Sequence, residues 1–146
     1  SRRALYKSLQ SSGMTIANYG TIFVSIADAD KPRALPLIRR FYELGFNIEA
    51  TGGTATFLRE NGIRTRMLKK LSEGSTEIFE SIRKGHVNYV INTIDINQHS
   101  ARLDGYDIRR CAVENNVTIF TALETVSVLL DVLEEITLGV STIDAE

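Results

Sequence analysis

Two short stretches supply groups suited to holding a phosphate: Ala50-Thr51-Gly52-Gly53-Thr54 and, further along, Ile91-Asn92-Thr93. Each follows a strand-like run and offers hydroxyls, an amide side chain or bare backbone N–H groups where that strand ends. In α/β folds, ligand phosphates bind at this edge of the sheet, where glycine-rich turns lead into helix N-termini. The chain has no comparable set of residues for making or breaking bonds, so it is predicted to sense a ligand.

The elements that position these stretches alternate between strands and helices along the chain. Strand-like runs occupy residues 21–26, 46–50, 65–68, 87–92 and 117–120, and helical patterns occupy 31–44, 53–61, 77–84, 107–115 and the segment from 122 onward. Residues 95–105 are polar and are predicted to be irregular. This alternation predicts an α/β fold, a single three-layer, doubly wound domain with a mainly parallel sheet of about five strands. Thr121 and Glu124 are predicted to form a capping box for the last helix.

Composition narrows the class of protein. The chain has 146 residues, of which 43% are hydrophobic and 24% charged, with a net charge of -1. These values fit one soluble domain with a core and favour neither a nucleic-acid nor a membrane partner. A single cysteine, Cys111, and the lack of a signal peptide favour a cytoplasmic location. The start at Ser1 without a methionine favours a fragment of a longer protein, although a processed or tag-cleaved protein would look the same.

Four segments deliver polar groups to the same predicted sheet edge. The candidate effector- and phosphate-binding residues are Ser25, Lys31, Thr51, Gly53, Thr54, Lys70, Asn92 and Thr93. Singly, each has a simpler explanation: a tight strand-to-helix turn with a capping threonine, surface lysines, or a capped strand. Their convergence favours an anion site. No catalytic residue is predicted, and His86 and His99 lack the spacing of metal ligands, so no metal site is predicted either.

In order along the chain, the motifs resemble the methylglyoxal-synthase-like domain family. Within that family they are most similar to the carboxyl-terminal allosteric domain of the carbamoyl phosphate synthetase large chain. The matching residues are Gly20 with the strand to Ser25, Asp30-Lys31, Gly45-Phe46, Ala50-Thr51-x-Gly53-Thr54, Gly62-Ile63, Lys70, Gly85, Ile91-Asn92-Thr93 and Ile108-Arg109-Arg110. Ala4-Leu5-Tyr6-Lys7 resembles the helix that joins this domain to the synthetase body. The resemblance therefore divides the chain into a linker helix over 1–18 and a regulatory domain over 19–146.

The resemblance implies a module that is not itself an enzyme, within a glutamine-hydrolysing ligase of pyrimidine and arginine biosynthesis. The expected effectors are UMP as inhibitor and phosphoribosyl pyrophosphate or IMP as activator, held by the eight residues above. The domain itself would need no cofactor, whereas the parent enzyme would use ATP with Mg or Mn. The remaining partners would be the synthetase domains of the same chain and the glutaminase small subunit.

Departures from the family pattern separate the alternatives. Methylglyoxal synthases carry a histidine where this chain has Ala27, and an acidic residue near Gly74-Ser75, where neither residue is acidic. Without a base to take a proton from a triose phosphate, a stand-alone lyase is the less favoured reading. The segment Ile119-Phe120-Thr121 lacks the tyrosine of ornithine-responsive synthetases, so no ornithine response is expected. A structural domain that binds nothing is the third alternative.

Overall fold

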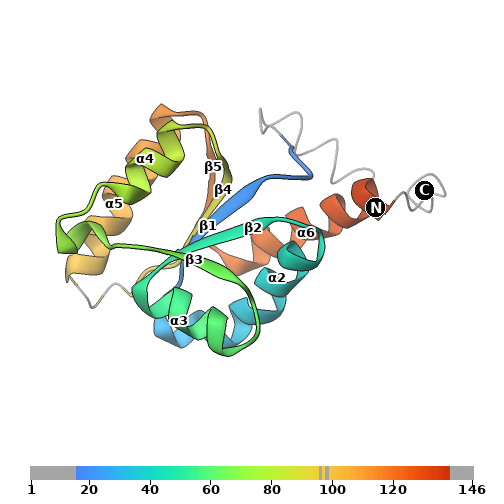
Figure 1. Cartoon of the computed structure of the whole chain (residues 1–146), viewed down its shortest axis with the longest axis horizontal. Coiled ribbons are helices and arrows are strands. Elements are labelled where there is room, and N and C mark those ends of the chain that lie inside the picture. Colours follow the sequence, from blue (N-terminus) through green and yellow to red (C-terminus); the bar gives the residue numbers. More distant parts are fainter. Residues whose placement is uncertain (1–15, 96, 98, 139–146) are drawn as a thin grey trace.

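The computed structural model describes residues 16–95, 97 and 99–138 of the chain. Five strands form one parallel sheet in the order β3-β2-β1-β4-β5 (Figure 1). The strands are β1 (Thr21–Ser25), β2 (Asn47–Thr51), β3 (Thr65–Leu68), β4 (Val87–Asn92) and β5 (Thr118–Phe120). The predicted α/β class and parallel sheet are confirmed. Of the predicted linker helix over residues 1–18, residues 1–15 lie outside the described residues.

Helices cover both faces of the sheet (Figure 1). One face carries α2 (Lys31–Glu43), α3 (Gly52–Glu60) and α6 (Leu123–Leu138), and the other carries α4 (Glu77–Arg83) and α5 (His99–Glu114). Short 3-10 turns, η1 (Asp28–Asp30) and η2 (Leu71–Glu73), follow β1 and β3. Because strand side chains alternate between faces, Ile22 and Val24 of β1 pack toward α2 and α6 while Phe23 packs toward α4 and α5.

The strand order reverses at β1, which lies between β2 and β4. Helices that leave β1 and β2 therefore turn to one face of the sheet, whereas those that leave β3 and β4 turn to the other. A crevice opens at such a reversal, outside the carboxyl ends of the strands. The ends of β1, β2 and β4 are where the two phosphate-suited stretches lie.

Helix α5 begins earlier than the sequence predicts. The segment 95–105 was expected to be irregular, but α5 starts at His99 and Gly105 lies inside it. A Cβ on Gly105 would lie 2.8 Å from Cδ1 of Ile94 and 3.0 Å from Nδ2 of Asn92. Gly105 thus lets α5 pack closely against the end of β4, a tertiary contact that overrides its poor helix propensity.

The predicted capping box of α6 is wrong by one residue. The helix begins at Leu123, and the N–H of Val126 donates to the carbonyl of Ala122 at 3.4 Å. Ala122 is therefore the N-cap, and Thr121 lies one position further out than a capping box requires. The sequence predicts an apolar stripe on this helix at Val126, Leu129, Leu130, Leu133 and Ile136. The first four are buried, whereas Ile136 is exposed.

Tyr89 of β4 ties the incoming chain to the core. Its hydroxyl accepts a hydrogen bond from the N–H of Ala17 and donates one to the Ala17 carbonyl, both at 2.7 Å. The ring is fully buried, between Phe41, Phe46 and Phe120. Burial raises the pKa of Tyr89 to about 12, partly offset by the hydrogen bond with Ala17. One side chain thus satisfies both peptide groups at the entry to the domain.

Tyr89→Phe should lower the free energy of unfolding at pH 7 by about 1–3 kcal/mol, because two partly buried backbone groups lose their partner. In the wild type, the raised pKa contributes stability that is present below about pH 10 and is lost as the pH rises toward 12. Urea unfolding from pH 7 to 11.5 should therefore show a shallower alkaline decline in the variant. Tyr19→Phe, at an exposed ring, is the control and should match the wild type; an equal alkaline decline in Tyr89→Phe would contradict the assignment.

Side chains bond backbone groups at the two ends of β3, an edge strand of the sheet. Nε of Arg59 donates to the carbonyl of Thr65 at 2.9 Å. At the other end, the N–H of Lys69 donates to Oε2 of Glu77 at 2.8 Å. Backbone groups at both ends of the strand are therefore bonded within the domain.

Candidate functional site

A cavity of about 320 Å³ lies where the sequence predicts the anion site, at the carboxyl ends of β1, β2 and β4. It is lined by Ser25, Ile26, Ala27, Asp28, Lys31, Thr51, Gly53, Thr54, Lys70, Thr93 and Asp95. Seven of the eight candidate residues thus lie around one space; Asn92 is the exception. Whether they bind a phosphate stays a prediction.

Two lysines approach the start of α3 from different elements. Lys31 is the first residue of α2, and Lys70 immediately precedes η2. A Cβ on Gly53 would lie 3.4 Å from Nζ of Lys31, and a Cβ on Gly52 would lie 3.6 Å from Cε of Lys70. Both lysine side chains therefore lie within van der Waals reach of the first residues of α3. Two ammonium groups at this position can neutralise a dianion from two sides.

The N-terminus of α3 keeps donors available to a ligand. Thr51 is its N-cap residue and is buried, yet its side chain makes no capping hydrogen bond. In an α-helix the first N–H groups have no intrahelical partner, and the helix dipole favours an anion there. Because Thr51 does not cap them, these N–H groups and the Thr51 hydroxyl can be used by a bound oxyanion.

Thr54 and Thr93 hold the loop after β1 from opposite sides. Oγ1 of Thr54 accepts the N–H of Ile26 at 3.0 Å, and Oγ1 of Thr93 accepts the N–H of Ala27 at 2.9 Å. The Thr93 N–H also donates to the Ser25 carbonyl at 3.0 Å. Both threonines line the cavity, and their hydrogen bonds fix the loop that leads to Lys31.

Asn92 is not brought into the cavity. It pairs with Ser25 in the sheet, and its buried amide lies against α5, close to Gly105. Strand periodicity explains this placement, because Asn92 shares the face of Val90, which packs toward α4 and α5. Ser25 is half-buried and does line the cavity.

Two carboxylates that the sequence reasoning missed also line the cavity. Asp28 forms an ion pair with Lys31, and Oδ1 of Asp95 accepts the N–H of Asn97 at 2.9 Å. The hydrogen bond and charge of Lys31, with a smaller contribution from Lys70, hold the pKa of Asp28 below its ordinary value. No motif in the sequence marks these carboxylates, although Asp28 lies three residues before Lys31, a spacing at which side chains on a helical turn form ion pairs.

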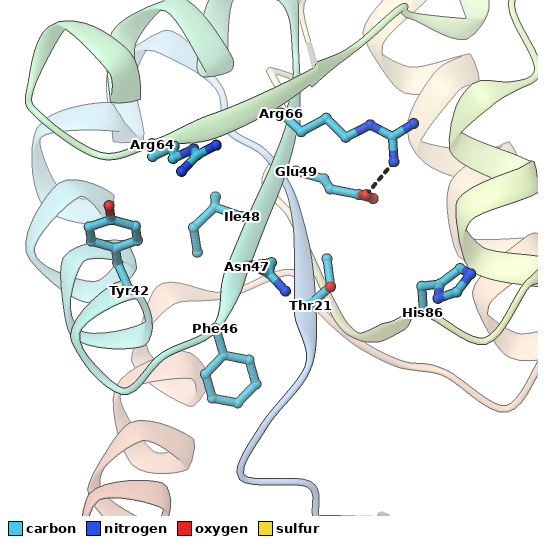
Figure 2. Close-up of a pocket in the computed structure, with 9 residues that line it drawn as sticks. All are labelled: Thr21, Tyr42, Phe46, Asn47, Ile48, Glu49, Arg64, Arg66 and His86. Atoms are coloured by element: carbon cyan, nitrogen blue, oxygen red, sulfur yellow. Dashed lines mark hydrogen bonds and ion pairs between the residues drawn. The ribbon is translucent and has the colours of Figure 1, made fainter.

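A larger cavity of about 550 Å³ lies near the amino-terminal end of β2 (Figure 2). It is lined by Thr21, Tyr42, Phe46, Asn47, Ile48, Glu49, Arg64, Arg66 and His86. Figure 2 shows Arg66 and Glu49 turned toward each other, with Nη1 and Oε2 separated by 3.2 Å. The buried Glu49 carboxylate also accepts a hydrogen bond from Ser81 of α4. In the larger cavity, the charges of Arg66 and Glu49 therefore partly neutralise each other. The smaller cavity, where lysines and helix N–H groups converge, is the better candidate for an anion site.

The described residues offer neither a cluster of metal ligands nor a helix that could span a membrane. Those residues contain no group of three or more His, Cys, Asp or Glu side chains that could hold a metal ion. None of the helices that the structure describes is long and apolar enough to cross a membrane.

Comparison with known proteins identifies the family. The family model described as MGS-like domain matches residues 33–121. Among solved structures, the crystal structure of methylglyoxal synthase from Elizabethkingia anophelis NUHP1 superposes with a TM-score of 0.64, at 18% sequence identity over 79% of each chain. That likeness concerns the fold. Because the family model spans more than half of the sequence, this chain belongs to the MGS-like domain family.

Proposed function

We propose that this chain is an allosteric regulatory domain of a carbamoyl phosphate synthetase large chain, and that its small cavity binds a phosphorylated nucleotide. The observation that carries the proposal is the convergence of Lys31, Lys70 and the uncapped start of α3 on one space. All of these groups favour a phosphoryl group, since cations and helix N-termini both stabilise oxyanions. UMP as inhibitor and phosphoribosyl pyrophosphate or IMP as activator are the proposed effectors.

Regulation requires that the effector bind one arrangement of the parent enzyme more tightly than another. Two phosphorylated effectors that compete for the same cavity can then act in opposite directions. The parts of each ligand beyond the phosphoryl group would decide which arrangement is favoured. The domain needs no chemical step for this role.

Titration calorimetry of the chain with UMP, phosphoribosyl pyrophosphate and IMP tests the proposal directly. We expect at least one of them to bind and to raise the unfolding temperature, because a ligand of the native state stabilises it. A chain that binds none of them, and whose unfolding temperature none of them shifts, would contradict the effector role.

A methylglyoxal synthase-type lyase is the second candidate, and the structural likeness to such an enzyme supports it. The cavity carries Ala27 where those enzymes have a histidine, and its carboxylates, Asp28 and Asp95, already accept hydrogen bonds from Lys31 and Asn97. The hydrogen bond from Lys31 holds the pKa of Asp28 below its ordinary value, which makes Asp28 a weaker general base. A colorimetric assay for methylglyoxal with dihydroxyacetone phosphate distinguishes the two: product formation would favour the lyase.

Gly53→Ala separates ligand binding from folding. The added methyl group would project into the cavity, 3.4 Å from Nζ of Lys31, and should weaken UMP binding about tenfold, equivalent to about 1.4 kcal/mol. Alanine favours the helix, so the unfolding temperature should stay the same or rise. Thr56→Ala, at an exposed position of the same helix, should leave UMP binding unchanged. Equal UMP affinities for Gly53→Ala and the wild type would place the ligand elsewhere.

A further inference from the structure

The lining of the small cavity contains both signs of charge, which an anion site does not require. Lys31 and Lys70 are accompanied by Asp28 and Asp95. The Asp28 side chain is 86% exposed and that of Lys31 only 16% exposed, so the carboxylate lies toward solvent and the ammonium lies inside. Asp28 therefore reaches the ammonium of Lys31 from the outer side of the cavity.

The Asp28 carboxylate takes up bonding capacity of Lys31 that a ligand oxygen would use. The two groups form an ion pair, and the Lys31 ammonium lies beside the start of α3, where donors to an oxyanion are available. A phosphoryl group at that position would meet the negative charge of Asp28 within a few ångströms. It would have to compete for Lys31 or tolerate the repulsion.

The competition favours a dianion. Exposed ion pairs contribute little stability, since solvent and salt screen them. A phosphomonoester carries up to two negative charges and can accept hydrogen bonds from both lysines and the helix N-terminus together. A monoanionic carboxylate ligand offers no more charge than Asp28 itself, and so has little advantage over it.

We infer that Asp28 is a built-in competitor for Lys31, which lowers the affinity of the cavity for phosphate and other anions. This inference rests on the proposed function only in using the same cavity. Asp28 belongs to η1, whose N-cap Ala27 is held by Thr93. If a ligand displaced the Asp28 carboxylate from Lys31, the Asp28 side chain could therefore move while Ala27, at the start of the turn, stays bonded to Thr93.

The test compares Asp28→Asn with Asp30→Asn by calorimetry with inorganic phosphate and with UMP. Asp30 lies in the same turn, pairs with Arg33 at 3.1 Å and does not line the cavity. Both variants change the net charge equally. Asp28→Asn should bind phosphate about three- to tenfold more tightly than the wild type, whereas Asp30→Asn should stay within about twofold. In an Asp28→Asn/Lys31→Met double variant, this gain should disappear.

Phosphate and UMP together distinguish the role of Asp28 from the proposed effector role. Phosphate binding without a gain in Asp28→Asn, or with the same gain in Asp30→Asn, would overturn the role of Asp28 and leave the effector role intact. A gain in phosphate affinity in Asp28→Asn, with no UMP binding to either protein, would support the competitor role and overturn the effector role. If neither phosphate nor UMP binds to either protein, both ideas are overturned. If UMP alone binds, an equal UMP affinity in Asp28→Asn and the wild type overturns the role of Asp28 and leaves the effector role intact.

Discussion

Replacing Lys31 and Lys70 together by methionine is expected to weaken UMP binding by about 100- to 10,000-fold. Each lysine is positioned to donate a charge-assisted hydrogen bond to a phosphoryl oxygen, and such bonds contribute about 1.5–3 kcal/mol each. Methionine keeps an unbranched side chain of similar length but removes the charge. The fold should survive, because the only ion pair lost among the described residues, Lys31–Asp28, is exposed on the Asp28 side. Calorimetry and thermal unfolding measure the two effects.

The matched control is Lys69→Met combined with Lys84→Met. Both lysines are exposed and lie outside the lining of the small cavity, and the change in net charge is the same. This control should bind UMP nearly as the wild type does. If the two double variants lose UMP affinity equally, the net positive charge removed, rather than a contact in the cavity, accounts for the loss.

Phe41→Ala should have the largest effect on stability, lowering the free energy of unfolding by about 3–5 kcal/mol. The Phe41 ring is fully buried and lies edge-on to Phe46, with ring centroids 5.3 Å apart and an interplanar angle of 87°. It also contacts Tyr89, with centroids 6.4 Å apart. Truncation leaves a cavity in a cluster of rings that cannot easily collapse. Urea unfolding followed by circular dichroism measures the loss.

The adjacent Tyr42 provides the comparison. This residue is 37% exposed and lines the larger cavity. Tyr42→Ala should cost no more than about 1 kcal/mol, as is usual for partly exposed positions. A Phe41→Ala loss as small as that of Tyr42→Ala would mean that the core rearranges to fill the space.

The strands and their order of appearance can be predicted from the sequence because their residues leave few alternatives. The run from Thr21 to Ser25 and the run from Val87 to Asn92 are rich in β-branched and aromatic residues, and both become central strands of the sheet. Turn glycines such as Gly45 and Gly62 adopt positive φ values, which other residues rarely do. Local chemistry therefore decides these parts of the fold.

The parts that escape prediction depend on contacts between distant segments. Gly105 normally disfavours a helix, and its place within α5 depends on close packing against Ile94 and Asn92. The contact that Asp28 makes with Lys31 from the solvent side depends on the turn after β1. Asn92 is the instructive exception: the two-residue period of a strand already assigns it to the face of Val90. Proximity to the end of a strand is thus not enough to place a side chain in the cavity.

The bonds at the ends of β3 have a consequence for how copies of this domain meet. Sheet edges with unpaired peptide groups can act as templates on which strands of other molecules assemble, in some proteins up to fibrils. Here the Arg59 guanidinium bonds the carbonyl of Thr65, and the Glu77 carboxylate bonds the N–H of Lys69. An incoming strand that used either group would first have to break its bond.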